Sequence, residues 1–458
     1  MGLIAKTTGF VLAGLVLTGC RGIPTPSEHA ARDNFQDVRN RYRSGDRHAT
    51  LPVLDTNATL EILMAYAMLN QPKVEAAYYD YAAAVERITT ERSLPDPRLT
   101  LELDIQDVVT AVMPGLMSDV PWLKKLRIRA DVASAESEAK FYAFESLVLQ
   151  TAYEVKRAYY QLWFLDDRIR INRETLALLN ELEQIARVRS EAGQVTLQDV
   201  LRAQIEQERL RTEIANLEDS RNPLLAQFKG ALGLRSDQPD PPMPREFEST
   251  PLDLSPEQLL HYALARNPRL KQIEAEVRMA ESGIRLARQS KLPDFNVGVE
   301  ADVKASPVMW RPSVGVTLPV WRDKIAAEIA AAQARKNAAQ ARLSAEQIQL
   351  AVEFADRSFT LRETTRNLAL LTDTLLPKAR QSLEIARAAY GTAKTDFINL
   401  LDAERSLLEF QLAQVDARTQ RELALAELSL LIVGLQPTGA SLLGTPVADK
   451  PSKDNPVK

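Results

Sequence analysis

Hydrophobic positions along this chain follow two different periods. Between about residues 123 and 190, apolar residues recur every three or four positions, as Val148, Ala152 and Val155 do. That spacing puts them on one face of a helix and is typical of a coiled-coil seam. At about 1.5 Å per residue, such a helix would be roughly 100 Å long. A similar apolar stripe in residues 203–228 predicts a return helix, so the two helices would form a long antiparallel hairpin.

Short segments elsewhere alternate apolar and polar residues. Clear alternation covers 99–106, 295–304 and 313–320. It predicts strands with one apolar and one polar face. A partner strand is expected within 108–120, but Pro114-Gly115 interrupts that segment and its alternation is poor. Each predicted strand offers about 8 or 9 residues, at or below the 9–11 that a tilted membrane-spanning strand needs.

The order of these elements occurs twice. If Leu201 is aligned with Leu401 and Ala203 with Ala403, the surrounding stretches coincide without a gap, and both predict the tip of a helical hairpin. Each half also carries an Asn and a Pro followed by Leu-Pro-Asp, at 70–72 and 94–96 and at 267–268 and 292–294. The predicted helices are 57–92, 123–190 and a return helix after the tip that ends near 230–233 in the first half, and 256–290, 323–389 and a last helix ending near 432 in the second. Pro377 is expected to kink the 323–389 helix.

Prolines separate the two halves. Six of them lie between residues 236 and 256, and neither a helix nor a central strand tolerates that density, so this segment is predicted to be a linker. The chain then divides into a signal peptide at 1–19, a lipidated N-terminal lead at 20–56, a first repeat at 57–235, the Pro-rich linker at 236–256, a second repeat at 257–436 and a mobile C-terminal tail at 437–458.

Residues 1–19 have the layout of a secretory signal. Lys6 is followed by an apolar run that is too short to span a bilayer as a helix. The four residues ending at Cys20 resemble a bacterial lipobox, which implies cleavage before Cys20 and lipidation of that residue. Arg21 in place of Asp favours, by the same resemblance, the outer membrane. The alternative is an ordinary signal with a chance cysteine. Residues 21–56 are predicted to be an extended or loosely ordered lead.

Composition and motifs exclude several classes of protein. The formal charge is −4 and no basic block interleaves with aromatics, so nucleic acid is not an expected partner. The single cysteine, Cys20, excludes an internal disulfide, and neither it nor the three histidines have the spacing of a metal site. No nucleophile elbow or phosphate loop is present, and the many acidic residues are interpreted as solvated helix charges. We therefore expect no enzyme, no cofactor and no metal.

Neither half of the chain can bury its own apolar positions. Charged residues such as Glu102 and Glu300 on one strand face, opposite aliphatics, suit a watery lumen and a lipid exterior. Four strands cannot close a lumen wide enough for a channel, so strands would be pooled between copies, and three copies would give twelve. Hairpins about 100 Å long also need neighbours to cover their stripes. The predicted fold is mainly α with a small β part, with duplicated long antiparallel helical hairpins.

The duplicated order, the Asn-Pro and Leu-Pro-Asp marks, the signal with Cys20 and the tip motif resemble the bacterial outer-membrane efflux factors, the TolC-like family, over roughly residues 57–436. The resemblance implies a homotrimer with a shared twelve-stranded β-barrel in outer-membrane lipid above a coiled-coil periplasmic tunnel. It also implies a periplasmic membrane-fusion adaptor docked at the hairpin tips and an inner-membrane efflux pump. Such a channel would export small molecules or metal ions. The alternative is a lipid-anchored periplasmic coiled-coil scaffold without a channel.

Tryptophans mark the ends of the strands. Trp122, Trp310 and Trp321 flank the strand regions and are candidates for the membrane interface. Pro121-Trp122 followed by Lys125-Leu126 resembles the Pro-Trp-x-Gly-Lys-Leu segment of the heavy-metal-type branch of the family. Leu123 and Lys124 depart from that branch, which has Pro and Gly there, so the segment says little about the cargo.

The resemblance implies acidic residues around the periplasmic aperture of the second tip. Position by position, they fall on Asn399 and Asp402, of which Asp402 alone keeps the carboxylate. Three like charges around one axis would oppose closure and favour cations. The alternative is that Asp402 is a solvated residue balanced by Arg405 at i+3.

The same resemblance implies adaptor docking at the two tips. The residues concerned are Gly193, Val195, Thr196 and Leu197 at the first tip and Ala393 and Thr395 at the second. Alternatively, they are turn residues only. Gly193 is expected to leave right-handed helical space. Ala393 stands where the family commonly has glycine, and Gly391 is then the candidate for the turn.

Overall fold

The computed structural model describes residues 24–43, 50–55, 58–105, 109–243, 255–392 and 394–434. The chain forms two compact units, and each draws on both halves of the sequence. The first, here called the sheet unit, comprises residues 1–48, 76–145 and 268–347. The second, the hairpin unit, comprises residues 49–75, 146–267 and 348–458.

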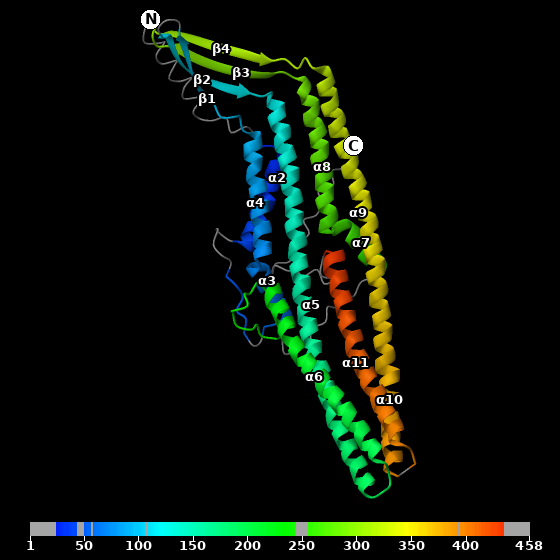
Figure 1. The fold of residues 1–458 in the computed structure, drawn as a ribbon. Coiled ribbons are helices and arrows are strands. Elements are labelled where there is room, and N and C mark those ends of the chain that lie inside the picture. The colour runs from blue at the N-terminus through cyan, green and yellow to red at the C-terminus, as the bar shows by residue number, and fades with distance from the viewer. Residues whose placement is uncertain are drawn as a thin grey trace. The chain divides into compact units, whose positions relative to one another are not determined.

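The sheet unit contains one four-stranded antiparallel sheet with the order β1-β2-β3-β4 (Figure 1). Its strands are β1 (Arg98–Ile105), β2 (Val109–Val120), β3 (Asp294–Asp302) and β4 (Met309–Thr317). The three alternating segments of the sequence are thus confirmed as strands. Because the order is open, β1 and β4 form its two edges.

β2 corrects the sequence-based prediction. It is a continuous strand of 12 residues, the longest of the four, rather than a short or broken one. Pro114 faces Leu101 of β1, and the pairing with β3 begins only at Gly115, so the missing N–H of Pro114 lies outside that ladder. A Cβ at Gly115 would lie 2.5 Å from Cγ of Glu300 and 2.6 Å from Oγ1 of Thr100. The Pro-Gly pair therefore suits a close crossing of three strands and does not end the strand.

The register separates an apolar and a polar face of the sheet. Leu99, Leu116, Val299 and Pro312 are successive partners across all four strands, and Leu99 is 84% exposed. Partners in a register lie on the same face. The neighbouring row, on the opposite face, is Thr100, Gly115, Glu300 and Arg311. The predicted alternation thus produces one continuous aliphatic face that the chain leaves uncovered.

Helices of the sheet unit include α2 (Pro26–Tyr42), most of α4 (Pro72–Arg92), α8 (Pro268–Arg288) and the first parts of α5 (Leu123–Glu191) and α9 (Arg322–Leu370). The expectation of an extended or loosely ordered lead is wrong for residues 26–42. Thr25 caps α2 by accepting from Glu28 N–H, and Pro26 occupies the first turn. Phe35 packs edge-on against Tyr81 of α4 with ring centroids 5.4 Å apart, which anchors the helix.

Two predicted helices are each broken in two by the asparagine marks. Residues 57–92 form α3 (Leu60–Asn70) and α4, and residues 256–290 form α7 (Pro256–Arg266), α8 and the short η2 (Gln289–Lys291). Asn70 Nδ2 donates to the carbonyl of Leu232 at 2.9 Å, and Asn267 Nδ2 donates to the carbonyl of Ile432 at 2.8 Å. These carbonyls end the two return helices, so each asparagine provides the hydrogen bonds that a helix terminus lacks.

The hairpin unit contains the lower part of α5, α6 (Leu197–Ala231), the end of α9, a π turn (Leu371–Leu375), α10 (Leu376–Gly391), α11 (Phe397–Glu427) and η4 (Leu428–Ile432) (Figure 1). The irregularity expected at Pro377 takes the form of the π turn just before it. Leu179, Val200, Leu383 and Leu400 share one buried apolar cluster near the tips. Among the described residues, none of the helices is both long and apolar enough to cross a bilayer.

Candidate docking and gating sites at the hairpin tips

The first tip joins α5 to α6 through a glycine. Gly193 has φ of 70°, as predicted, and Gln194 N–H donates to the carbonyl of Arg189 at 2.9 Å. This bond across five residues with a left-handed glycine is the usual way to satisfy the last carbonyls of a helix. Thr196 is then extended and precedes the first turn of α6, where Asp199 N–H donates to its carbonyl at 3.2 Å.

The second tip repeats this turn 200 positions later. Lys394 N–H donates to the carbonyl of Ala389 at 2.9 Å, and Asn399 N–H donates to that of Asp396 at 3.2 Å. Ala393 lies outside the described residues. Gly391 is the last residue of α10, and the described glycines with positive φ are Gly193, Gly233 and Gly434. The expectation that Gly391 supplies the turn is therefore wrong.

The predicted docking residues are divided between surface and packing. Gly193, Thr196 and Leu197 are exposed, and a Cβ at Gly193 would meet no atom within 4 Å. Val195 is partly buried and packs against the apolar cluster of the tips. The first tip thus exposes Gly193, Thr196 and Leu197 to solvent, while Val195 packs against the apolar cluster. Its docking role stays a prediction.

A shallow groove of about 560 Å³ runs between α10 and α11 at the second tip. Ala386, Ala389 and Ala403 line it, together with Thr395 and Asn399. Small side chains permit another helix to approach the backbone closely. The groove brings Thr395, predicted for docking, beside Asn399, predicted for the aperture.

The two aperture candidates lie on the first turns of α11. Asp402 has a 61% exposed side chain, and one of its oxygens lies 3.7 Å from the guanidinium of Arg405. Asn399 Nδ2 donates to Oγ1 of Thr395 at 3.0 Å. The ion pair expected under the alternative interpretation is therefore present, and the ring of aspartates stays a prediction because it needs further copies of the chain.

Ion pairs and a cation–π contact tie the two hairpins together, and sequence reasoning missed them. Arg189 places its guanidinium 4.6 Å from the centre of the Tyr390 ring and donates to the carbonyl of Tyr390. Arg405 donates to Glu206 of α6. Partners about 200 positions apart carry no local signal, although the alignment of the two tips could have suggested which helices meet.

A buried carboxyl adjoins these contacts. Glu404 is 3% exposed, and burial raises the pKa of its carboxyl to about 7, with the charge of Glu206 adding to the rise and that of Arg405 opposing it. The interpretation of every helix carboxylate as solvated is wrong here. We therefore expect the packing of the hairpins around this buried carboxyl to depend on pH.

The sequence matches the outer membrane efflux protein family over residues 63–234 and 259–434, which are three quarters of the chain. The chain belongs to the outer membrane efflux protein family. The two matched segments fall one in each half of the sequence, as the repeat does.

Relatives of this efflux protein include the cobalt-zinc-cadmium resistance protein CzcC of Cupriavidus metallidurans, 22% identical over 77% of this chain and 84% of that protein. The outer membrane protein OprJ of Pseudomonas aeruginosa is 29% identical over 28% of this chain and 27% of its own. The structure of the outer-membrane channel OprN has a TM-score of 0.71 and 18% identity, over 85% of this chain and 96% of that one. The predicted fold class is therefore confirmed.

These relatives also bear on the chemistry of the efflux protein. The family is one of outer membrane efflux proteins and OprN is an outer-membrane channel, neither of which is an enzyme, and this confirms the prediction of a non-enzymatic protein. Within the described part of the chain, no group of three or more His, Cys, Asp or Glu residues could hold a metal ion.

Proposed function

We propose that three copies of this chain form a channel across the outer membrane that continues as a helical tunnel into the periplasm. The observation that carries the proposal is the open sheet, whose aliphatic row of Leu99, Leu116, Val299 and Pro312 is exposed while its other face is polar. In water such a face would drive aggregation, and in lipid it would be stable. The edges β1 and β4 would then pair with neighbouring copies, giving twelve strands.

This observation favours the channel over a lipid-anchored scaffold. A coiled-coil scaffold needs the hairpins, but it has no use for four strands with one lipid-compatible face. The lengths of the strands, from 8 residues in β1 to 12 in β2, are compatible with the 9–11 or so of a tilted span. Cys20, which lies outside the described residues, would add an acyl anchor to the same membrane.

The tips would dock a periplasmic membrane-fusion adaptor. Support comes from the exposed Gly193, Thr196 and Leu197 at the first tip and from the alanine-lined groove at the second, to which Thr395 contributes. Such surfaces suit the ends of partner helices. The adaptor would link the channel to an inner-membrane efflux pump, and Asp402 with Asn399 would surround the periplasmic aperture.

The cargo would be small molecules or metal ions. A relative named for resistance to cobalt, zinc and cadmium supports metal ions, and the channel proteins among the other relatives support export in general. At 22% identity the name of a relative does not select one cargo.

Planar bilayer recordings on the purified protein test the proposal. Wild-type protein should insert as a heat-modifiable trimer and give discrete ion-conducting steps. Asp402→Ala should change conductance or cation selectivity, because a carboxylate near the axis attracts cations. Unchanged traces would remove Asp402 from the aperture, and an absence of steps in wild type would refute the channel.

Docking is tested separately in cells. Val195→Trp should abolish resistance while protein still reaches the outer membrane, because a bulky ring there displaces the turn from its packed base. Thr212→Trp, at an exposed position of α6 away from the tip, is the matched control and should retain resistance. Equal resistance of both variants would count against docking at the first tip.

A further inference from the structure

The sheet unit has a cavity where the sheet meets the helices. It has a volume of about 810 Å³ and is formed by the end of β2, the first turns of α5, the last turn of α8 and the start of β3. Lys125 fixes this junction, because its ammonium group lies 2.8 Å from the carboxylate of Asp294 and 3.1 Å from the carbonyl of Leu292. Lys125 of the Pro-Trp segment is thus a structural residue. The neighbouring cavity is lined by other side chains.

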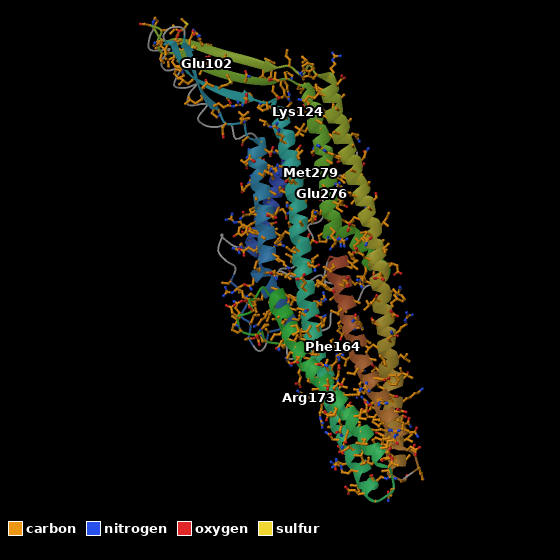
Figure 2. All side chains as sticks on the ribbon, in the orientation of Figure 1. Glu102, Lys124, Phe164, Arg173, Glu276 and Met279 are labelled. Atoms are coloured by element: carbon orange, nitrogen blue, oxygen red, sulfur yellow. The ribbon has the colours of Figure 1, made fainter. Side chains whose placement is uncertain are left out.

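Basic side chains dominate the polar lining of this cavity. Lys124, Arg127 and Arg288 are exposed, and within the described part of the chain none of the three has an ion-pair partner (Figure 2 labels Lys124 at the start of α5). Arg285 pairs with Asp131, the one acidic residue of the lining, at 3.5 Å. The lining therefore has an excess of positive charge that nothing in the described chain neutralises.

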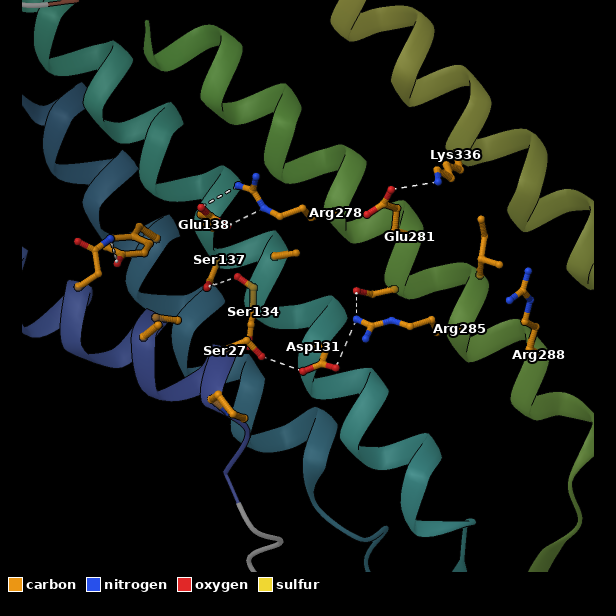
Figure 3. A pocket seen from close by; sticks show the side chains of 18 of the residues that line it. Ser27, Asp131, Ser134, Ser137, Glu138, Arg278, Glu281, Arg285, Arg288 and Lys336 are labelled. Atoms are coloured by element: carbon orange, nitrogen blue, oxygen red, sulfur yellow. Dashed lines mark hydrogen bonds and ion pairs between the residues drawn. The ribbon is translucent and has the colours of Figure 1, made fainter. Parts of the chain in front are cut away.

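The single carboxylate is already in use. Asp131 accepts a hydrogen bond from Ser27 Oγ at 2.8 Å on one side and faces Arg285 on the other (Figure 3). Ser27 belongs to the first turn of α2 and does not itself line the cavity. It follows that an anion, rather than a cation, suits the open positions of Lys124, Arg127 and Arg288.

The other side of the cavity is apolar and continues the lipid-facing surface. Trp122 stacks obliquely on Phe295 with ring centroids 6.1 Å apart, yet remains 40% exposed, and Leu123 beside it is 73% exposed. Phe295 is paired with Val120 and Val316 in the sheet, on the aliphatic face. A basic recess bordered by a tryptophan at the end of an aliphatic face is the combination that meets a headgroup and the start of an acyl chain.

We infer that this cavity is a binding site for an anionic phospholipid. The phosphate oxygens would be bound by Lys124, Arg127 and Arg288, and the first part of the acyl chains would lie against Trp122 and Leu123. The ligand is lipid rather than free phosphate because the basic recess is continuous with exposed apolar side chains that a soluble anion does not use. This inference rests on the proposed function, which puts the aliphatic face of the sheet in a membrane.

The short sequence distance between Cys20 and the start of α2 is compatible with this site. Cys20 precedes Ser27 by seven residues in the sequence, a span that reaches about 25 Å at most. An acyl anchor on Cys20 would therefore hold the membrane surface within reach of Ser27, which donates to Asp131 in the lining of the cavity. Anchor and headgroup site would then engage the same leaflet.

Native mass spectrometry of the detergent-purified full-length protein tests the site, with phosphatidylglycerol and phosphatidylcholine as the lipids. Phosphatidylglycerol should bind in preference. The triple variant Lys124→Gln, Arg127→Gln, Arg288→Gln should lose at least about tenfold in phosphatidylglycerol affinity, since each basic residue near an anionic surface is worth about fivefold. The control triple variant Lys291→Gln, Arg362→Gln, Arg366→Gln removes the same charge from exposed positions outside the cavity and should bind as wild type does.

The outcomes separate the possibilities. Equal binding of the two lipids by wild type, or unchanged phosphatidylglycerol affinity in the triple variant, would overturn the inference. Efficient displacement of the lipid by inorganic phosphate would assign the cavity to a soluble anion instead. Should the triple variant not assemble, Arg288→Gln alone should still lose about fivefold. Conductance in bilayers that contain both phosphatidylglycerol and phosphatidylcholine tests the channel itself: a conducting protein without lipid preference refutes only this site, and a non-conducting one refutes the proposed function.

Discussion

The sheet and the hairpin tips of this protein treat apolar side chains in opposite ways. The sheet turns Leu99 and its row outward and leaves them exposed, while the tips enclose Leu179, Val200 and Leu400 and even bury the carboxyl of Glu404. Both regions obey the same rule, that apolar area is stabilised where water is absent. The difference indicates different surroundings. Under the proposed function, lipid and neighbouring copies would complete the sheet, whereas the packing at the tips is largely supplied by the chain itself.

Placing charges on the aliphatic face of the sheet should have the largest effect, because that face is expected to contact lipid. Leu101→Asp combined with Val314→Asp puts two carboxylates on the exposed aliphatic face, and a charge facing lipid costs up to about 2–4 kcal/mol for Arg or Lys and somewhat less for Asp. We expect the double variant to fail to assemble in outer membranes, as measured by the heat-modifiable trimer band. Thr100→Asp on the polar face is the control and should assemble. Normal assembly of both variants would mean that lipid does not contact this face.

A cavity at the tips should have the next largest effect. Leu400→Ala removes a fully buried side chain from the cluster that joins the hairpins, at a cost of about 2–5 kcal/mol. The expected result is faster proteolytic cleavage at the tips, with the sheet still protected by membrane. Leu197→Ala, at an exposed position of the first tip, should change cleavage little. If both variants were cut at the wild-type rate, the tips would not depend on this cluster.

Acidity should alter the tips by a smaller amount. Because burial raises the pKa of Glu404 to about 7 from the usual 4.5, the folded tip binds a proton that the unfolded chain releases. Stability should therefore fall as the pH rises from about 4.5 to 7 and level off above, by about 1–3 kcal/mol. Proteolysis of the tips against pH measures it, and Glu404→Gln should flatten the profile. A profile unchanged by Glu404→Gln would assign the dependence to other groups.

The turn at the first tip should show the smallest effect. Gly193→Ala forces an L side chain into left-handed backbone at a cost of about 1–2 kcal/mol, although space for the Cβ is free. Thermal unfolding should shift down slightly. Gly230→Ala, at a helical glycine with open space around it, should leave stability the same or raise it. A larger loss of stability in Gly230→Ala than in Gly193→Ala would show that the left-handed turn at Gly193 contributes nothing to stability.

Local patterns predicted the fold well and the contacts at the tips poorly. The 3- and 4-residue spacing in 123–190 predicted α5 almost to the residue, because a long helix needs only local periodicity. A strand was expected within 108–120, where β2 lies, but its continuity through Pro114-Gly115 was not, because that pair is accommodated by Glu300 and Thr100, which are distant in sequence. Likewise Arg405 meets Glu206 only after both hairpins have formed, so no local signal exists for that pair.

The two asparagines that mark the repeats have a structural role that their sequence pattern does not reveal. Asn70 and Asn267 were recognised as repeat markers, yet a continuous helix was predicted through each of them. In the structure both side chains cap the return helix of their own half, at Leu232 and Ile432, which requires the backbone to turn there. A residue that recurs at the same place in two repeats therefore indicates a tertiary contact that both repeats share.

Single-particle imaging of the purified protein in lipid nanodiscs tests the central claim most directly. The account predicts a three-fold particle in which β1 of each copy lies beside β4 of the next, closing twelve strands around an open lumen within the lipid disc. A single-copy particle, or a sheet lying outside the lipid with both edges unpaired, would contradict it.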